Sequence, residues 1–241
     1  MLPPGGASLV EFLQAVRRLQ DGDTQAPITA PARPDRRSSS FAHLFFDLIR
    51  GDALAVRRDA ADTAAECRDT GIAGLLTYPL IYLASAQLLL GEFLDAMASA
   101  EEGLRIAADT GQTAMTGQLA ATAALVAAIV GDEEACRARA AQLRDLSASA
   151  QAVSLPGADC ALAMLDLGSA RYQSALNLMQ AVTAGPGRRH PALLYAYPDH
   201  VEAAVRAGQP GLAAQPLAQF TAWAAPSASR GPPRWLPGAP R

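Results

Sequence analysis

Two histidines and an aspartate in the C-terminal third are the residues best suited to metal binding or acid–base catalysis. His190 ends the glycine-rich segment GPGRRH, and Asp199 and His200 follow in YPDH. The two histidines stand ten positions apart, so they cannot share a helix face at i, i+4, and no complete set of ligands is obvious. We therefore interpret His200 as a residue of a first helical turn and His190 as a loop residue.

The segment 185–189, Gly-Pro-Gly-Arg-Arg, combines glycine with positive charge, as phosphate-binding loops do. It follows no predicted strand and contains no lysine. All 20 basic residues of the chain are arginine, which excludes a P-loop lysine, a Schiff-base lysine and a kinase-type lysine from this sequence. We interpret 185–189 as a loop between structural repeats.

The possible nucleophiles also lack the neighbours that catalysis needs. Cys67, Cys136 and Cys160 are widely separated and form no C-x-x-C pair, which argues against a disulfide framework and against a zinc site. No base or helix start that would activate a thiol is apparent, and no G-x-S-x-G segment is present. The sequence therefore predicts a protein that is not an enzyme and needs no cofactor or metal, with reduced thiols in the cytoplasm.

Composition indicates a helical protein with a large core. The chain has 241 residues, of which 50% are hydrophobic and only 5% aromatic, and alanine and leucine dominate the apolar set. The formal net charge is −3, so a strongly basic nucleic-acid-binding domain is excluded for the chain as a whole. We expect no direct binding of nucleic acid.

A short pattern recurs along the chain and indicates the elements that would position any site. A glycine, or once an alanine, is followed by a polar residue and, five positions later, by a small residue. The first positions of the copies are Gly51, Gly91, Gly131, Ala170 and Gly208, at intervals of 40, 40, 39 and 38 residues. The small residues are Val56, Ala96, Cys136, Ala175 and Ala213.

Each copy has the features of a tight turn between two helices. Glycine accepts the left-handed conformation that ends a helix, an acidic residue after it can cap the next helix, and a small residue lets the two helices approach closely. One such pair cannot bury its apolar face, but stacked pairs can. The sequence therefore predicts an all-α, right-handed, tetratricopeptide-like α-solenoid of about five antiparallel helix pairs with a period of about 40 residues.

The ends of the chain depart from this pattern. We expect an N-terminal helical fragment over 1–23, a proline-rich linker over 24–40, the solenoid over 41–225 and a disordered tail over 226–241. The last helix is predicted over about 210–225, and its apolar residues would form an open face through which the chain self-associates. These residues are Leu212, Leu217, Phe220 and Trp223.

Two stretches without charge, 70–91 and 110–131, are long enough to cross a bilayer. They lack flanking lysine or arginine clusters and an aromatic belt, so we interpret them as buried helices of a soluble array with no membrane association. The N-terminus has no signal-peptide pattern, in keeping with a cytoplasmic location. Tyr78-Pro79 and Tyr197-Pro198 are predicted to begin two helices, because proline is favoured in a first turn.

Three segments carry a resemblance to a known family. The segments 74–112 (GLLTYPLIYLASAQLLLGEFLDAMASAEEGLRIAADTGQ) and 123–143 (AALVAAIVGDEEACRARAAQL) resemble the helical-repeat region of large ATP-dependent LuxR-family transcriptional regulators. The segment 190–224 is similar to the last repeat before the DNA-binding domain in that family. The resemblance covers about residues 40–224.

In that family the resemblance implies a nucleotide-binding module, a tetratricopeptide-like sensor and a helix-turn-helix. This chain has no G-x-x-x-x-G-K-[ST] motif and no helix-turn-helix after 224, so it looks like the middle of such a regulator or a remnant of one. We expect a non-catalytic interaction or effector-sensing region with a protein, a peptide or a small effector as its partner. The alternative is a stand-alone scaffold that binds a peptide or protein in its concave groove.

Tetratricopeptide geometry places the first helix of each pair along a concave groove. The polar or amphipathic side chains that we predict to face this groove are Tyr78, Ser85, Gln118, Tyr195 and Glu202. Ordinary surface exposure or packing between helices is the alternative interpretation of the same five residues.

Overall fold

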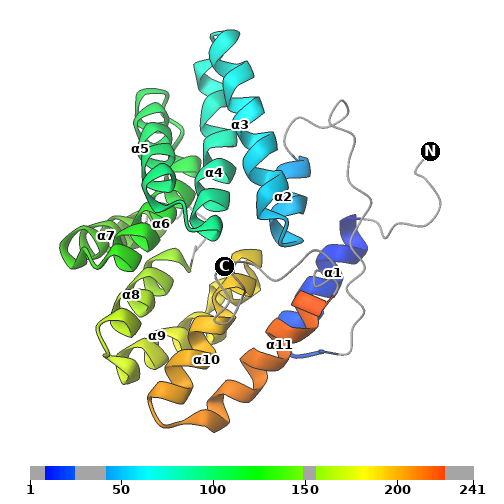
Figure 1. Cartoon of the computed structure of the whole chain (residues 1–241), viewed down its shortest axis with the longest axis vertical. Coiled ribbons are helices and arrows are strands. Elements are labelled where there is room, and N and C mark those ends of the chain that lie inside the picture. Colours follow the sequence, from blue (N-terminus) through cyan, green and yellow to red (C-terminus); the bar gives the residue numbers. More distant parts are fainter. Residues whose placement is uncertain (1–8, 25–41, 149–155, 226–241) are drawn as a thin grey trace.

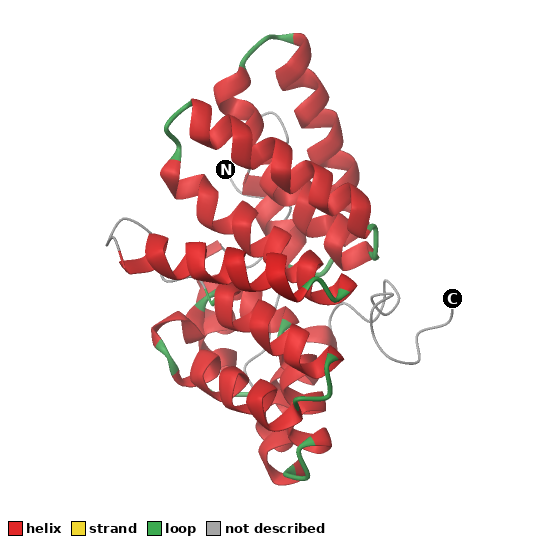
Figure 2. Cartoon of the chain, turned by 90° about the vertical axis from the view of Figure 1, so that its left-hand side faces the viewer, coloured by secondary structure: helices red, strands yellow, loops and turns green. Residues whose placement is uncertain are grey.

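The computed structural model describes residues 9–24, 42–148 and 156–225, and every regular element within these ranges is a helix. Figure 2 shows helices joined by short loops, without a strand in the described ranges. The predicted all-α fold class is confirmed. The predicted tail, 226–241, and nearly all of the predicted linker lie outside the described residues.

The helices follow one another at short intervals along the described chain. The α-helices are α1 (Leu9–Gln20), α2 (Ala42–Ile49), α3 (Ala53–Asp69), α4 (Ala73–Leu90), α5 (Phe93–Asp109), α6 (Thr113–Val130), α7 (Glu133–Ala148), α8 (Gly157–Gly168), α9 (Tyr172–Ala184), α10 (Tyr197–Arg206) and α11 (Ala214–Ala224). The 3-10 helices are η1 (Pro186–Arg189), η2 (Pro191–Tyr195) and η3 (Pro210–Ala213). From α3 to α11, each α-helix packs against the next α-helix in the sequence (Figure 1).

The five predicted turns all lie where one helix ends and the next begins. The backbone angle φ is +78° at Gly51, +79° at both Gly91 and Gly131, +58° at Ala170 and +74° at Gly208. These values place each residue in the left-handed region, which glycine adopts without strain. The predicted register of the turns is therefore confirmed, including the copy that has alanine instead of glycine.

The small residues five positions after each turn are buried between helices. The exposed fraction is 0% for Val56, Ala96, Cys136 and Ala175, and 6% for Ala213. A larger side chain would have to displace the facing helix, because protein interiors leave few voids. Their burial agrees with the predicted packing role of these positions.

The acidic residue after the turn acts as a cap in two copies. Asp52 and Asp132 each accept a hydrogen bond from the backbone N–H three residues later, at 3.2 and 2.9 Å. Glu92 makes no such cap, and its carboxylate instead lies 2.6 Å from the guanidinium of Arg57. The predicted capping role is thus confirmed at the aspartates and wrong at the glutamate, whose longer side chain reaches the neighbouring repeat.

Ion pairs join the second helices of successive pairs at one repeat spacing. They link Arg57 with Glu92, Arg68 with Glu102, Arg139 with Glu101 and Arg171 with Glu133. Most of these side chains are partly exposed, so each pair contributes little to stability. They occupy different positions in successive repeats, so each pair is an individual contact between neighbouring repeats.

The two Tyr-Pro pairs have different positions. Pro198 lies in the first turn of α10, as predicted. Pro79 lies inside α4, which already begins at Ala73, so its prediction as a helix start is wrong. The helix begins earlier because Gly71, with φ +69°, ends α3 only two residues before it.

The end of the array is closed by the beginning of the chain. Helix α1 lies beside α11 (Figure 1), and their apolar side chains form one buried cluster with Ile49. The indole N–H of Trp223 donates to the carbonyl oxygen of Ile49 at 2.8 Å. The expected open terminal face is therefore wrong at Phe220 and Trp223, which are 8% and 4% exposed.

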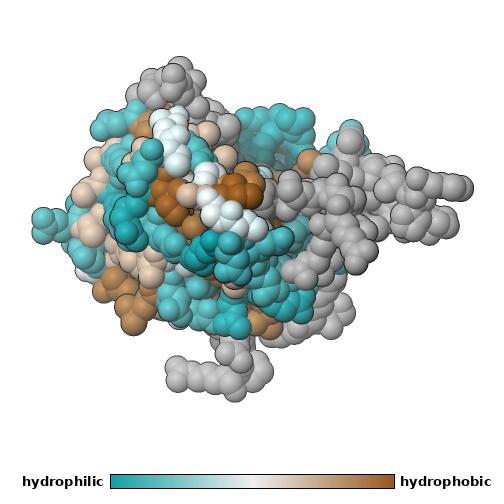
Figure 3. All heavy atoms as spheres, turned by 90° about the horizontal axis from the view of Figure 1, so that it is seen from above, coloured by the Kyte–Doolittle hydropathy of each residue, from teal (hydrophilic) through white to brown (hydrophobic). Residues whose placement is uncertain are grey.

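Exposed apolar residues remain elsewhere on the surface. Leu217 of α11 is 51% exposed and Leu94 of α5 is 86% exposed. The face seen in Figure 3 carries separate apolar patches among hydrophilic ones. Self-association stays a prediction. Phe220 and Trp223 of α11 cannot contribute to it, because they are buried.

Two helices have the length and composition of membrane spans, namely α4 and α6, which fall in the uncharged stretches of the sequence. Half of each apolar window is buried against other helices of the chain. This burial is typical of core helices, and length and composition alone are weak evidence of a membrane span. The cytoplasmic location stays a prediction.

Candidate functional site

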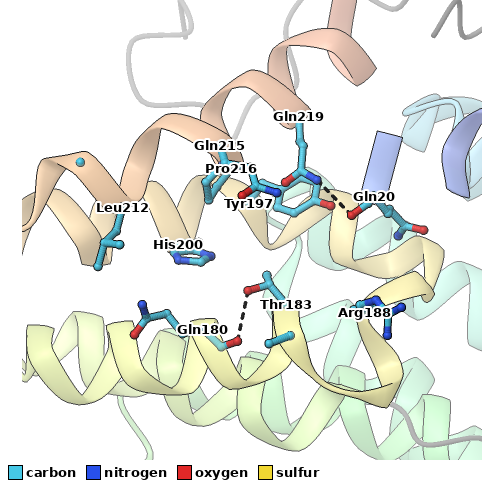
Figure 4. Close-up of a pocket in the computed structure, with 12 residues that line it drawn as sticks. Gln20, Gln180, Thr183, Arg188, Tyr197, His200, Leu212, Gln215, Pro216 and Gln219 are labelled. Carbon is cyan, nitrogen blue, oxygen red and sulfur yellow. Dashed lines mark hydrogen bonds between the residues drawn. The ribbon is translucent and has the colours of Figure 1, made fainter. Parts of the chain in front are cut away.

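A pocket of about 380 Å³ lies between α1, α9, α10 and the η3–α11 segment. Figure 4 shows side chains from these elements facing a common space. The polar residues of the lining are Gln20, Gln180, Thr183, Arg188, Tyr197, His200, Gln215 and Gln219. Ala184, Gly211, Leu212 and Pro216 complete it. Its size falls within the usual range of small-molecule sites.

Helix α1 forms one wall of the pocket and is held by side-chain hydrogen bonds to distant residues. The amide of Gln219 donates to the carbonyl oxygens of Leu19 and Gln20 at 2.8 and 3.1 Å. The amide nitrogen of Gln20 donates to the carbonyl oxygen of His190 at 2.9 Å. The two bonds from Gln219 satisfy carbonyls at the end of α1 that have no partner within the helix.

His200 and Tyr197 form the buried side of the pocket, one helical turn apart on α10. His200 is 5% exposed, and its Nδ1 has no hydrogen-bond partner among the described residues. Burial lowers the pKa of His200, so its neutral form is favoured. Tyr197 is 3% exposed, and burial raises the pKa of its hydroxyl to about 12.

The positive charge at the pocket comes from the segment 185–189, whose arginines lie in η1. Arg188 lines the pocket. Arg189 instead holds Asp21 through two hydrogen bonds of 3.1 and 3.0 Å, which lower the pKa of that carboxyl. The segment is thus a connection between helices, as predicted, and it also contributes to the pocket wall.

The residues singled out for metal or acid–base chemistry do not assemble into a centre. Nδ1 of His190 accepts a hydrogen bond from the backbone N–H of Ala192 at 3.2 Å and so caps η2, while His200 faces the pocket. Within the described ranges, no group of three or more potential ligands could hold a metal ion. The predicted local structural role agrees with this geometry for His190. His200 lies near the start of α10, as predicted, and also lines the pocket.

Asp199 has a strongly shifted titration but lies outside the pocket lining. Burial raises the pKa of its carboxyl from 3.8 to about 7, and the negative charge of Glu202 adds to the shift.

Cys160 is 9% exposed, and burial raises the pKa of its thiol. A buried, protonated thiol is a poor nucleophile. Cys160 therefore has the properties of a packing residue.

The five predicted groove residues lie on four elements and make mostly local contacts. Tyr78 packs against Tyr82, with ring centroids 5.4 Å apart, and the Ser85 hydroxyl donates to the carbonyl of Ile81 at 2.8 Å. Gln118 is exposed on α6.

The last two of the five are in the C-terminal region. The Tyr195 hydroxyl donates to the carbonyl oxygen of Leu48, and Glu202 is paired with Arg206 at 3.4 Å. None of the five lines the pocket beside His200. Their role in binding stays a prediction.

The pocket was not predicted from the sequence, because its walls come from opposite ends of the chain. Gln20 and Gln219 are 199 residues apart, and no local pattern reports their contact. Two weak signals were present, the basic segment 185–189 and the histidine in the first turn of α10. Neither feature indicates a site unless the position of α1 is known.

Comparisons with known proteins give no relative: no family model, curated protein or solved structure matches this chain. The site therefore has to be interpreted from its own geometry.

Proposed function

We propose that this chain is a non-catalytic helical-repeat module that senses an effector, of the kind that the resembling segments suggest for large LuxR-type regulators. The observation that carries the proposal is the pocket at the junction of the two ends, in an array of helix pairs that recur at intervals of 38 to 40 residues. A right-handed, tetratricopeptide-like arrangement accords with that spacing.

The chemistry of the lining favours binding over catalysis. The described residues of the lining include no carboxylate and no cysteine, so none of them is an acidic partner that would orient His200. Amides, a phenol and an imidazole are groups that fix the orientation of a ligand. Binding at a place where α1 meets α10 and α11 would change the stability of that junction, which is how a sensor transmits occupancy.

A screen of metabolite mixtures against the purified chain by saturation-transfer NMR tests this proposal. We expect at least one small compound to bind reversibly and to be recovered unchanged. Turnover of a bound compound, or binding of peptides alone, would contradict effector sensing and favour an enzyme or the peptide-binding scaffold.

The absence of direct DNA binding is tested separately by mobility shift at physiological salt. We expect affinities no tighter than the non-specific range of about 10⁻⁴–10⁻⁶ M, because the net charge is −3. A sequence-specific shift would contradict the proposed role of this chain.

A further inference from the structure

The pocket contains buried polar atoms that the described part of the chain leaves without partners. These are Nδ1 of His200 and Oε1 of Gln20, on side chains that are 5% and 8% exposed. A buried polar group without a hydrogen bond is unfavourable, and such groups are rare in folded proteins unless water or a ligand satisfies them. Both residues line the same pocket from different helices (Figure 4). The two atoms themselves have almost no accessible surface, so a ligand in the pocket contacts them only when the imidazole ring or the amide group rotates.

The charge of the lining indicates the charge of the ligand. Among the described residues of the lining, Arg188 alone carries a full charge, because no lysine or carboxylate is one of them. Asp21 forms its ion pair with Arg189, and the charge of Arg188 also helps to lower the pKa of that carboxyl. A guanidinium in a pocket lining that makes no direct ion pair with a described residue favours an anionic ligand group, and its planar fork matches a carboxylate.

The remaining lining indicates that the ligand is organic and hydroxylated. Four glutamine side chains and the Tyr197 hydroxyl offer donors and acceptors, while Leu212 and Pro216 offer apolar surface. Inorganic phosphate would leave most of these groups unused. A nucleotide would bring several negative charges to a pocket with one arginine.

We propose that this pocket binds a small hydroxylated carboxylic acid, whose carboxylate pairs with Arg188 and whose hydroxyl groups contact His200, Gln20 and Tyr197. This inference rests on the proposed effector-sensing function and names the chemical class of the effector. Because Gln20 is the last residue of α1, the bound acid would also hold α1 against α10 and α11.

Isothermal titration with three matched probes tests the proposal: gluconate, its uncharged analogue sorbitol, and inorganic phosphate. We expect gluconate to bind with a dissociation constant of about 1 mM or tighter, and sorbitol and phosphate to bind at least tenfold more weakly. Equal binding of sorbitol would contradict the carboxylate contact. Equal binding of phosphate would contradict the contacts to the hydroxyl groups.

Variants locate the binding. Arg188→Gln is expected to weaken gluconate binding about tenfold to a hundredfold, as loss of a charge-assisted hydrogen bond does, and Tyr197→Phe several-fold. Arg105→Gln removes an exposed arginine of α5, remote from this pocket, and is expected to leave binding unchanged. Circular dichroism melts show whether each variant is folded.

The result that would overturn the inference is gluconate binding that is absent, or that Arg188→Gln does not affect while the variant remains folded. If the metabolite screen still finds another small effector, the proposed function stands and only the ligand class or the pocket is wrong. If no small effector binds in either experiment, both proposals fail.

Discussion

Helices α3 to α7 are held together by contacts that recur, whereas the junction of α1 and α2 with α11 is held by contacts that occur once. In the first region, alanines such as Ala96 and Ala123 are fully buried, and ion pairs link one pair of helices to the next. In the junction, the rings of Tyr195 and Trp223 meet edge to face with centroids 4.9 Å apart. Side chains there donate to backbone carbonyls of remote helices.

The two regions also differ in the sequence separation of their contacts. Hydrogen-bonded side chains of successive repeats are 34 to 38 residues apart, as at Arg68–Glu102 and Arg139–Glu101. The junction contacts span 147 to 200 residues. The array therefore distributes its stability over many small contacts, while the junction concentrates it in a few large side chains. A truncation in the junction is expected to have the larger effect.

Trp223→Ala is expected to have the largest effect on stability. It removes a side chain that is 4% exposed, together with its hydrogen bond to Ile49. Truncation of a buried aromatic side chain costs about 3–5 kcal/mol of unfolding free energy. Urea denaturation followed by circular dichroism measures the loss, and Trp223→Phe, which keeps a ring, is expected to lose less. A loss below about 1 kcal/mol would mean that the junction is not part of the core.

Ala96→Leu tests the close approach of helices in the regular array. The side chain of Ala96 is fully buried five residues after the turn at Gly91, so a leucine would overpack this contact at a cost of about 1–3 kcal/mol. Ala98→Leu, at an exposed position of the same helix, is the matched control and is expected to change little. An unchanged urea midpoint for Ala96→Leu would contradict the repeat register.

Most of the array could be predicted because its determinants are local. A glycine such as Gly131 ends a helix through its own backbone freedom, and the burial of Cys136 follows from its distance from that turn. Pro79 does not mark the start of α4, because the Asp-Thr-Gly turn at 69–71 ends the preceding helix and lets α4 begin at Ala73. A proline within a helix is tolerated only when tertiary contacts compensate for its missing hydrogen bond.

Ala170→Gly is expected to stabilise the protein. Ala170 has φ +58°, and its neighbour Arg171 pairs with the buried carboxylate of Asp166 at 2.7 Å, which fixes this turn in place. An alanine in the left-handed region costs about 1 kcal/mol relative to glycine. Thermal and urea unfolding should show a gain of about that size, with a loss of similar size for Gly131→Ala. A loss for Ala170→Gly would contradict the left-handed conformation of the fourth turn.

Asp199→Asn tests how the ionisation of a carboxyl group in the C-terminal region changes the stability with pH. The variant keeps a side chain of similar size but cannot ionise. The folded-state pKa of Asp199 is about 7, against 3.8 without burial, so between about pH 4 and pH 7 the folded state binds a proton that the unfolded state does not. The contribution of Asp199 to stability therefore falls as the pH rises through this window. This effect is expected to be smaller than the full pKa difference implies, because the side chain keeps some contact with solvent.

Urea denaturation at several pH values measures this effect as the difference between the variant and the parent protein. The stability of Asp199→Asn relative to the parent should increase from about pH 4 to pH 7 and then stay constant, because His190 and His200 titrate in both proteins. A difference that does not change with pH would contradict the raised pKa.

The pocket could not be predicted, because it is formed by residues far apart in the sequence, as the junction is. The predicted position of His200 near a helix start is right, but its position in the pocket lining depends on α1. The predicted groove residue Tyr195 instead uses its hydroxyl to bind the carbonyl of Leu48 in the junction. Contacts over such distances in sequence leave no periodic signal, so sequence patterns predict the repeats and not their closure.

Hydrogen–deuterium exchange of the amides of α1 tests the central claim most directly, namely that the beginning of the chain closes the end of the array. In the unaltered protein, α1 amides are expected to be protected to about the same degree as those of α10. In Trp223→Ala, α1 should lose its protection while α5 and α6 keep theirs. Exchange of α1 in the unaltered protein at the rate of an unfolded peptide would contradict the closure and the pocket that depends on it.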